Sequence, residues 1–126
     1  MDRNRITIND NGIAHIPDGE IWMSELELIE LFHTIVPTLR AAVRAVFKSG
    51  VCDIGTDHRT EITLEGYRLD CYNLSMITAL AFRINTAGAK AVRDALLERM
   101  MSRRKEEINL FLSLGMKEVR TPTGMA

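Results

Sequence analysis

The sequence predicts an α+β fold, because two segments have the alternating pattern of β-hairpins and the others have the spacing of helices. Near the N-terminus, RITI and IAHI flank the turn-forming NDNG. In the middle of the chain, TEITL and YRLDCY alternate polar and apolar residues around EG. From NLSMITALAF onward the spacing is helical. We expect an N-terminal β-hairpin, a central β-hairpin and C-terminal helices, in one domain over residues 1–115 with a flexible tail at 116–126.

The composition indicates an ordinary globular domain rather than a membrane-spanning or disulfide-rich chain. Of the 126 residues, 46% are hydrophobic and 26% are charged, as in an ordinary globular domain of this length. No apolar run approaches the roughly 20 residues that cross a bilayer. The two cysteines, Cys52 and Cys71, are too few for a disulfide framework. We therefore expect a cytoplasmic protein without membrane association.

Local signals place two helices between the hairpins. Ser24 and Glu27 form a capping-box pattern, so the first helix should cover residues 25–32. The segment HTIV then interrupts the helical spacing. Pro37 suits the first turn of a second helix, and Gly50 suits its end. The segment EIWM before the first helix should be extended, with its tryptophan anchoring the core.

Two more helices are expected after the central hairpin. Asn73 or Ser75 should cap the first of them, and its apolar side chains, Phe82 among them, should be buried. The segment NTAG should end that helix. A long helix should follow over residues 89–113, closed by Gly115.

The order of these elements predicts a winged helix–turn–helix-like domain. The helix over 25–32, the short break and the second helix would form the helix–turn–helix, and the central hairpin would form the wing. Domains of this kind place the second helix in the major groove of double-stranded DNA. The outer side of the second helix is therefore where a functional surface is expected.

The second helix, PTLRAAVRAVFK, is amphipathic. At about 100° per residue, its apolar side chains fall on one stripe, made of Leu39, Val43, Val46 and Phe47. Its cations lie away from that stripe and are separated by small residues; they are Arg40, Arg44 and Lys48, with Ala41 and Ala45 between them. Small outward residues let a helix approach DNA closely, while flanking cations reach phosphates or guanine edges. An ordinary solvated helix face has the same pattern.

The charge distribution leaves both interpretations open. A net charge of −1 is unlike the basic excess of a general nucleic-acid binder. Residues 1–36 hold 2 basic and 7 acidic side chains, whereas residues 76–126 hold 9 and 5, so the positive charge is concentrated after residue 36. A localised DNA-binding surface is compatible with this distribution. The alternative is a module without DNA binding, whose second helix contacts an acidic protein partner or another domain.

Two segments resemble the RhuM-type virulence-protein family of bacterial genomes and mobile elements. IWMSELELIELF…VPTLRAAVRAVFKSG is similar to the helix–turn–helix segment of that family, and YRLDCYNLSMITALAFRINTAGAKAVRDAL is similar to its YNL block. The resemblance covers about residues 5–97 and matches the front part of longer members. Here Ile29 and His33 stand where the family often has a small residue and a glycine, and VRDAL stands in place of FRxWA. The resemblance implies DNA binding, in regulation by a mobile element.

On both grounds we expect non-enzymatic binding of double-stranded DNA, with the helix over 37–48 in the major groove. The cations of the helix, with Arg59 or Arg68 from the hairpin, should contact phosphates. Base edges should be contacted by Thr38, Arg40, Ala41 and Arg44. The residues expected at the interface are Thr38, Arg40, Ala41, Arg44, Lys48, Arg59 and Arg68. The first five belong to the second helix, and the last two belong to the central hairpin.

The pattern of reactive residues favours neither an enzyme nor a cofactor or metal site. Cys52, His58 and Cys71 lack the paired spacing of zinc ligands. A nucleophilic set of Cys71, His58 and Asp57 would require the hairpin to bring the three side chains together. The segment GIAHIPDG lacks the lysine and the helix of a phosphate-binding loop.

The predicted last helix has more apolar positions than one packed helix needs. They are Val92, Leu96, Met100, Ile108, Phe111 and Leu112. This excess predicts a homodimer formed through the C-terminal helix, which would present two second helices to DNA. The basic run RMMSRRKEE at 99–107 should be a solvated face rather than a further DNA contact.

Overall fold

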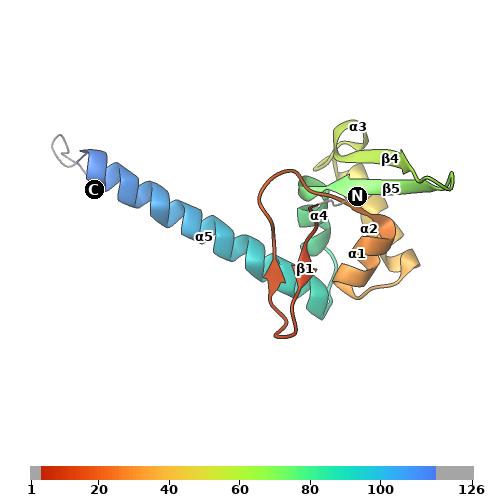
Figure 1. The fold of residues 1–126 in the computed structure, drawn as a ribbon, viewed down its shortest axis with the longest axis horizontal. Coiled ribbons are helices and arrows are strands. Elements are labelled where there is room, and N and C mark those ends of the chain that lie inside the picture. Colours follow the sequence, from red (N-terminus) through yellow and green to blue (C-terminus); the bar gives the residue numbers. More distant parts are fainter. Residues whose placement is uncertain (1–3, 116–126) are drawn as a thin grey trace. The chain divides into compact units, whose positions relative to one another are not determined.

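The computed structural model describes residues 4–115, and Figure 1 shows the succession of helices and strands. The chain divides into two units, Met1–Leu96 and Leu97–Ala126. Helices and two small antiparallel sheets are both present, so the predicted α+β class is confirmed. The tail predicted at 116–126 lies outside the described residues, and the single domain over 1–115 stays a prediction.

The first unit begins with the predicted N-terminal hairpin. Strand β1 (Thr7–Ile8) pairs antiparallel with β2 (Ala14–His15). The side chain of Asn9 holds the intervening turn, since its Oδ1 accepts the backbone N–H groups of Asn11 and Ile13 at 2.9 and 3.0 Å. An asparagine that bonds its own downstream backbone is a common device of tight turns.

The segment that follows places a strand directly before a helix. Strand β3 (Trp22–Ser24) leads into α1 (Glu25–Phe32), which has the predicted bounds. The backbone N–H of Glu27 donates to Ser24 Oγ at 3.3 Å, and the N–H of Ser24 donates to the Glu27 carboxylate at 2.8 Å. This confirms the capping box and fixes where the helix starts.

A three-residue turn joins α1 to α2 (Val36–Ser49). His33 opens this turn in the left-handed conformation, with φ 52° and ψ 51°. The N–H of Thr34 then donates to the carbonyl of Ile29 at 3.1 Å. Histidine thus adopts the conformation that makes glycine common at such turns. At its other end α2 stops at Gly50, which has φ 83°, as predicted.

The second sheet has three strands. After the short helix α3 (Ile54–Asp57), the central hairpin forms from β4 (His58–Ile62) and β5 (Arg68–Asn73). The strand order is β3-β5-β4, and both pairings are antiparallel. The hairpin was predicted, whereas its pairing with β3 was not. This pairing fastens the hairpin to the strand that leads into α1.

The helix α4 (Leu74–Ala81) is capped by Asn73, one of the two predicted caps. The side-chain oxygen of Asn73 accepts the N–H of Met76 at 3.1 Å. Its amide nitrogen donates to Asp57 at 2.9 Å, which ties the start of α4 to α3. One polar side chain therefore caps α4 and joins its beginning to the end of α3.

The core of the first unit lies among α1, α2, α4, β3 and the beginning of α5 (Ala87–Gly115). Its largest fully buried side chains are Phe32, Ile21, Met23, Leu28, Leu39, Met76, Ile77, Leu80, Val92 and Cys71. Two sequence expectations are wrong here. Trp22 is only half-buried, because alternation along β3 turns Met23 toward the core instead. Phe82 is 55% exposed, because α4 ends at Ala81.

In the second unit α5 exposes a series of large apolar side chains. Met100, Ile108, Phe111 and Leu112 are each at least half exposed. Of the six apolar positions predicted on this helix, only Val92 is fully buried, and Leu96 is partly buried against the core. Within the described part of the chain, no helix is both long and apolar enough to cross a membrane.

Candidate nucleic-acid interface

The outward side of α2 carries two of the predicted cations, Arg44 and Lys48. Both are exposed, and so are Thr38 and Ala41 on the same helix. The opposite side of α2 is buried, as the predicted apolar stripe requires. Neither Arg44 nor Lys48 has an ion-pair or hydrogen-bond partner within residues 4–115. Two positive charges on this helix are therefore available to a ligand.

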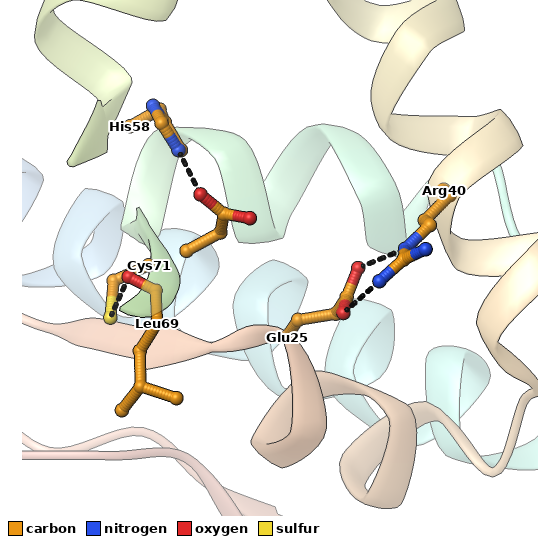
Figure 2. Close-up of polar contacts among 6 residues, drawn as sticks. Glu25, Arg40, His58, Leu69 and Cys71 are labelled. Carbon is orange, nitrogen blue, oxygen red and sulfur yellow. Dashed lines mark hydrogen bonds and ion pairs between the residues drawn. The ribbon is translucent and has the colours of Figure 1, made fainter. Parts of the chain in front are cut away.

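Arg40, by contrast, is held by Glu25, the first residue of α1. Its Nε and Nη2 donate to the two oxygens of the Glu25 carboxylate at 2.7 and 3.0 Å, as Figure 2 shows. The hydrogen bond and the negative charge of Glu25 raise the pKa of Arg40 above its ordinary value. A bidentate pair of this kind fixes the guanidinium in position and neutralises its charge. Arg40 therefore joins α2 to α1 before it meets any ligand.

The neighbouring sheet face has mixed charge. Arg68, Asp70 and Tyr72 point to the same face of β5, because alternate residues of a strand share a face. His58 Nε2 lies 3.0 Å from the Asp70 carboxylate, and the His58 ring lies 5.3 Å from the ring of Tyr72. Burial, followed by the charge of Asp70, raises the pKa of Tyr72 to about 12. The ring of Phe47, 6.5 Å away, places this face against α2.

The two predicted cations of the central hairpin differ in their environment. Arg59 donates to the Glu61 carboxylate at 2.9 Å, and its guanidinium lies 4.2 Å above the centre of the Trp22 ring. Arg68 is exposed and has no partner within the described residues. Cation–π contact and ion pairing therefore engage Arg59, whereas Arg68 is available.

The predicted interface is thus only partly supported by the geometry. The structure gathers Thr38, Ala41, Arg44 and Lys48 on α2 and leaves Arg68 exposed on β5, but Arg40 and Arg59 are engaged within the chain. Sequence reasoning missed both engagements. The sequence signal for the pair of Arg40 with Glu25 was the acidic first turn of α1, a position where acidic residues are favoured. No local signal links Trp22 to Arg59, which is far away in the sequence.

The cysteine and histidine residues do not form a reactive set. In the sheet register Cys71 faces Arg59, whereas His58 faces Tyr72, so their side chains lie on opposite faces. His58 contacts Asp70 rather than Asp57. Burial, with the nearby charge of Asp57, raises the pKa of Cys52, which disfavours a reactive thiolate. Within residues 4–115 no three such side chains are grouped to hold a metal ion.

One hollow of ≈ 310 Å³ is lined by residues of the N-terminal hairpin and α1. Its polar wall includes Arg5 and Glu27, which form an ion pair at 3.0 Å. These two charges therefore pair with each other, and Glu30 and His33 also line the hollow.

Comparison with known proteins does not assign the chain to a family. No family model, curated protein or solved structure matches it. The function therefore rests on the geometry of α2 and the central hairpin.

Proposed function

We propose that this chain binds double-stranded DNA without catalysing a reaction, through a winged helix–turn–helix whose second helix enters the major groove. In this proposal α1, the turn and α2 form the helix–turn–helix, and β4 and β5 form the wing. The pairing of β3 with β5 supports it, because it fixes the hairpin to the strand that precedes α1. The observation that carries the proposal is the outward face of α2, where Ala41 accompanies Arg44 and Lys48, two exposed cations without a partner among residues 4–115.

Each exposed residue has a role that follows from its chemistry. Arg44 and Lys48 contact phosphates, or guanine edges in the case of Arg44. Thr38 and Ala41 allow the α2 backbone to approach the bases closely. Arg68 supplies a phosphate contact from the hairpin. Arg40 keeps α2 in place through Glu25, so its role is mainly to position the helix.

We propose that the chain belongs to the RhuM-type family, on the sequence segments that resemble it, and acts as a regulator linked to a mobile element. The turn supports this comparison, because His33 adopts the left-handed conformation where the family often has glycine. With a net charge of −1, binding must depend on a local cluster of cations rather than on overall charge.

The first prediction concerns Arg44 and Lys48, the two cations of α2 that pair with no other described residue. Replacing Arg44 and Lys48 together by alanine should abolish retention of DNA fragments at moderate salt, because two phosphate contacts are lost. The slope of log K against log salt should become shallower by about 2, since each phosphate contact contributes about 0.9. Fluorescence anisotropy on fragments selected from the source genome measures both quantities, and circular dichroism checks the fold.

The matched control removes the same charge elsewhere. Arg83 and Arg103 are exposed cations outside α2 and the hairpin, without a side-chain partner among residues 4–115, and their double alanine variant should bind DNA like the original chain. An equal loss in both double variants would mean that only net charge matters. Unchanged binding by the Arg44→Ala, Lys48→Ala variant, or no binding by the original chain, would refute the proposal.

A second candidate function is a protein-interaction module, favoured by the tip of the central hairpin. Leu64 is fully exposed and Tyr67 is 69% exposed. The tip is well defined, because the N–H of Thr63 donates to the Tyr67 carbonyl at 2.8 Å and the N–H of Gly66 donates to Thr63 at 2.9 Å. Binding that resists salt and disappears when other proteins are removed would favour this function over DNA binding.

A further inference from the structure

The second unit carries an apolar stripe with no cover within the described residues. Leu97, Met100, Met101, Ile108, Phe111 and Leu112 are between 46% and 66% exposed. At about 100° per residue these six side chains fall within roughly 120° of one another on the helix surface. The opposite side is polar except for Leu110; its members are Glu98, Arg99, Ser102, Arg103, Lys105, Glu106, Asn109 and Ser113. Residues 97–113 therefore form an amphipathic helix with an exposed apolar face.

The spacing along this stripe is that of a coiled-coil seam. Leu97, Met101, position 104, Ile108 and Phe111 follow one another at alternating steps of four and three residues. Such a repeat keeps a continuous line of side chains facing a second helix. The single polar member of the seam is Arg104, and a polar residue at one seam position commonly determines register and orientation.

The charge sequence distinguishes the two possible orientations of a partner helix. In a parallel pair in register, Arg104 would face Arg104 of the other copy, and two cations would meet in an apolar seam. In an antiparallel pair centred on residue 106, Arg104 lies opposite Ile108 of the other copy and beside its Glu107. Two reciprocal Arg104–Glu107 pairs then form around the twofold axis. The order of three basic residues followed by two acidic ones therefore complements itself only in the antiparallel arrangement.

The area of the stripe suits a second copy of this chain. The six half-exposed side chains would lose roughly 600 to 700 Å² of accessible surface per copy, close to the ~800 Å² per partner of a standard stable interface. We propose that residues 97–113 form an antiparallel, two-helix interface between two copies of the chain, with Leu97, Met101, Ile108 and Phe111 in the seam and Arg104 paired with Glu107 of the other copy. This interface does not depend on DNA binding.

The second prediction tests the seam with a matched pair of variants. Ile108→Asp places a charge in the interface, whereas Leu110→Asp places the same charge on the opposite side of the helix, where Leu110 is 60% exposed. The original chain and Leu110→Asp should sediment as dimers at micromolar concentration, and Ile108→Asp should sediment as a monomer. Circular dichroism at 222 nm confirms that both variants keep their helices.

Charge exchange tests the orientation. Arg104→Glu should weaken the dimer at least tenfold, because it places a carboxylate beside Glu107 of the other copy. The double variant Arg104→Glu, Glu107→Arg should restore the dimer in the antiparallel arrangement. In a parallel arrangement the double variant would still oppose two glutamates. Arg103→Glu, on the polar side of the helix, should leave the dissociation constant unchanged.

Cross-linking gives an independent measure of orientation. A mixture of Met101→Cys and Phe111→Cys chains should form a mixed disulfide on mild oxidation, because these positions face each other across an antiparallel pair. Neither variant should cross-link with itself, and the original chain, whose cysteines are buried, should not cross-link. A monomer at high concentration, equal effects of Ile108→Asp and Leu110→Asp, or self cross-linking at position 101 would overturn the proposal.

Discussion

At the scale of single residues, the Glu25 carboxylate decides how much of α2 is available to a polyanion. Arg40 has the spacing of a DNA contact, and periodicity alone does not separate it from Arg44 or Lys48. The difference is tertiary, because α1 starts beside Arg40 and places Glu25 within 2.7 Å of its Nε. The apolar stripe was predictable from sequence because it depends only on helix geometry. The pairing was not, because it depends on the angle between two helices.

The third prediction follows from this pair. In DNA-binding assays Arg40→Ala should have a smaller effect than Arg44→Ala, because Glu25 already neutralises Arg40. Glu25→Gln should release Arg40, tighten DNA binding severalfold and steepen the salt slope by about 1. In the Glu25→Gln background Arg40→Ala should then remove that gain. A double-mutant cycle measured by anisotropy checks the coupling.

One result of this double-mutant cycle would contradict the prediction. If Arg40→Ala and Arg44→Ala weaken binding equally in the original chain, then Arg40 leaves Glu25 when DNA binds. In that case Glu25→Gln should also change affinity little. Thermal unfolding of each single variant separates loss of contact from loss of fold.

At the scale of elements, boundaries set by local chemistry were predictable and pairings between distant segments were not. Ser24, Gly50 and Asn73 mark helix ends through their own side chains or their own φ angle, so they could be identified from sequence. The pairing of β3 with β5 joins segments almost fifty residues apart. Which strand pairs with β5 depends on how the core packs in the complete fold, and no local sequence pattern shows it. The mistaken burial of Phe82 has the same origin, because helical spacing does not reveal that α4 stops one residue earlier.

The fourth prediction concerns the contact between α5 and α1. A methyl group at Gly88 would collide with the carbonyl oxygen of Leu31 and lie 2.8 and 2.9 Å from the C and Cα atoms of Phe32. These are backbone atoms at the end of α1, so they cannot move aside as a side-chain end would. Gly88→Ala should therefore lower the free energy of unfolding by roughly 1 to 3 kcal/mol, as overpacking does. Urea denaturation followed by circular dichroism measures this loss.

Gly55 provides the control for that experiment. A methyl group there would be 3.6 Å from the nearest atom, the Asp53 carboxylate, which is an ordinary contact. Gly55→Ala should leave the stability within about 0.5 kcal/mol of the original chain. A Gly88→Ala variant as stable as Gly55→Ala would mean that α5 does not pack this closely on α1.

At the scale of the whole molecule, each of the two units carries one of the two proposed binding surfaces. The first unit holds the exposed cations of α2 and the hairpin, and the second holds the apolar stripe of α5. The excess of apolar positions on the last helix was visible in the sequence. Which of these positions are buried was not predictable from the sequence. The structure shows that Val92 lies in the core, whereas Ile108 is half exposed.

The fifth prediction links the two units and rests on both proposals. A dimer carries two copies of α2, so a DNA molecule with two half-sites is bound through twice the number of cations. Ile108→Asp should therefore weaken binding to such DNA by about 100-fold and roughly halve the salt slope, while binding to a single half-site stays unchanged. Leu110→Asp should bind both DNAs like the original chain. If Ile108→Asp sediments as a monomer yet binds the two-site DNA with full affinity and slope, then one copy is sufficient for recognition, and the dimer serves another purpose.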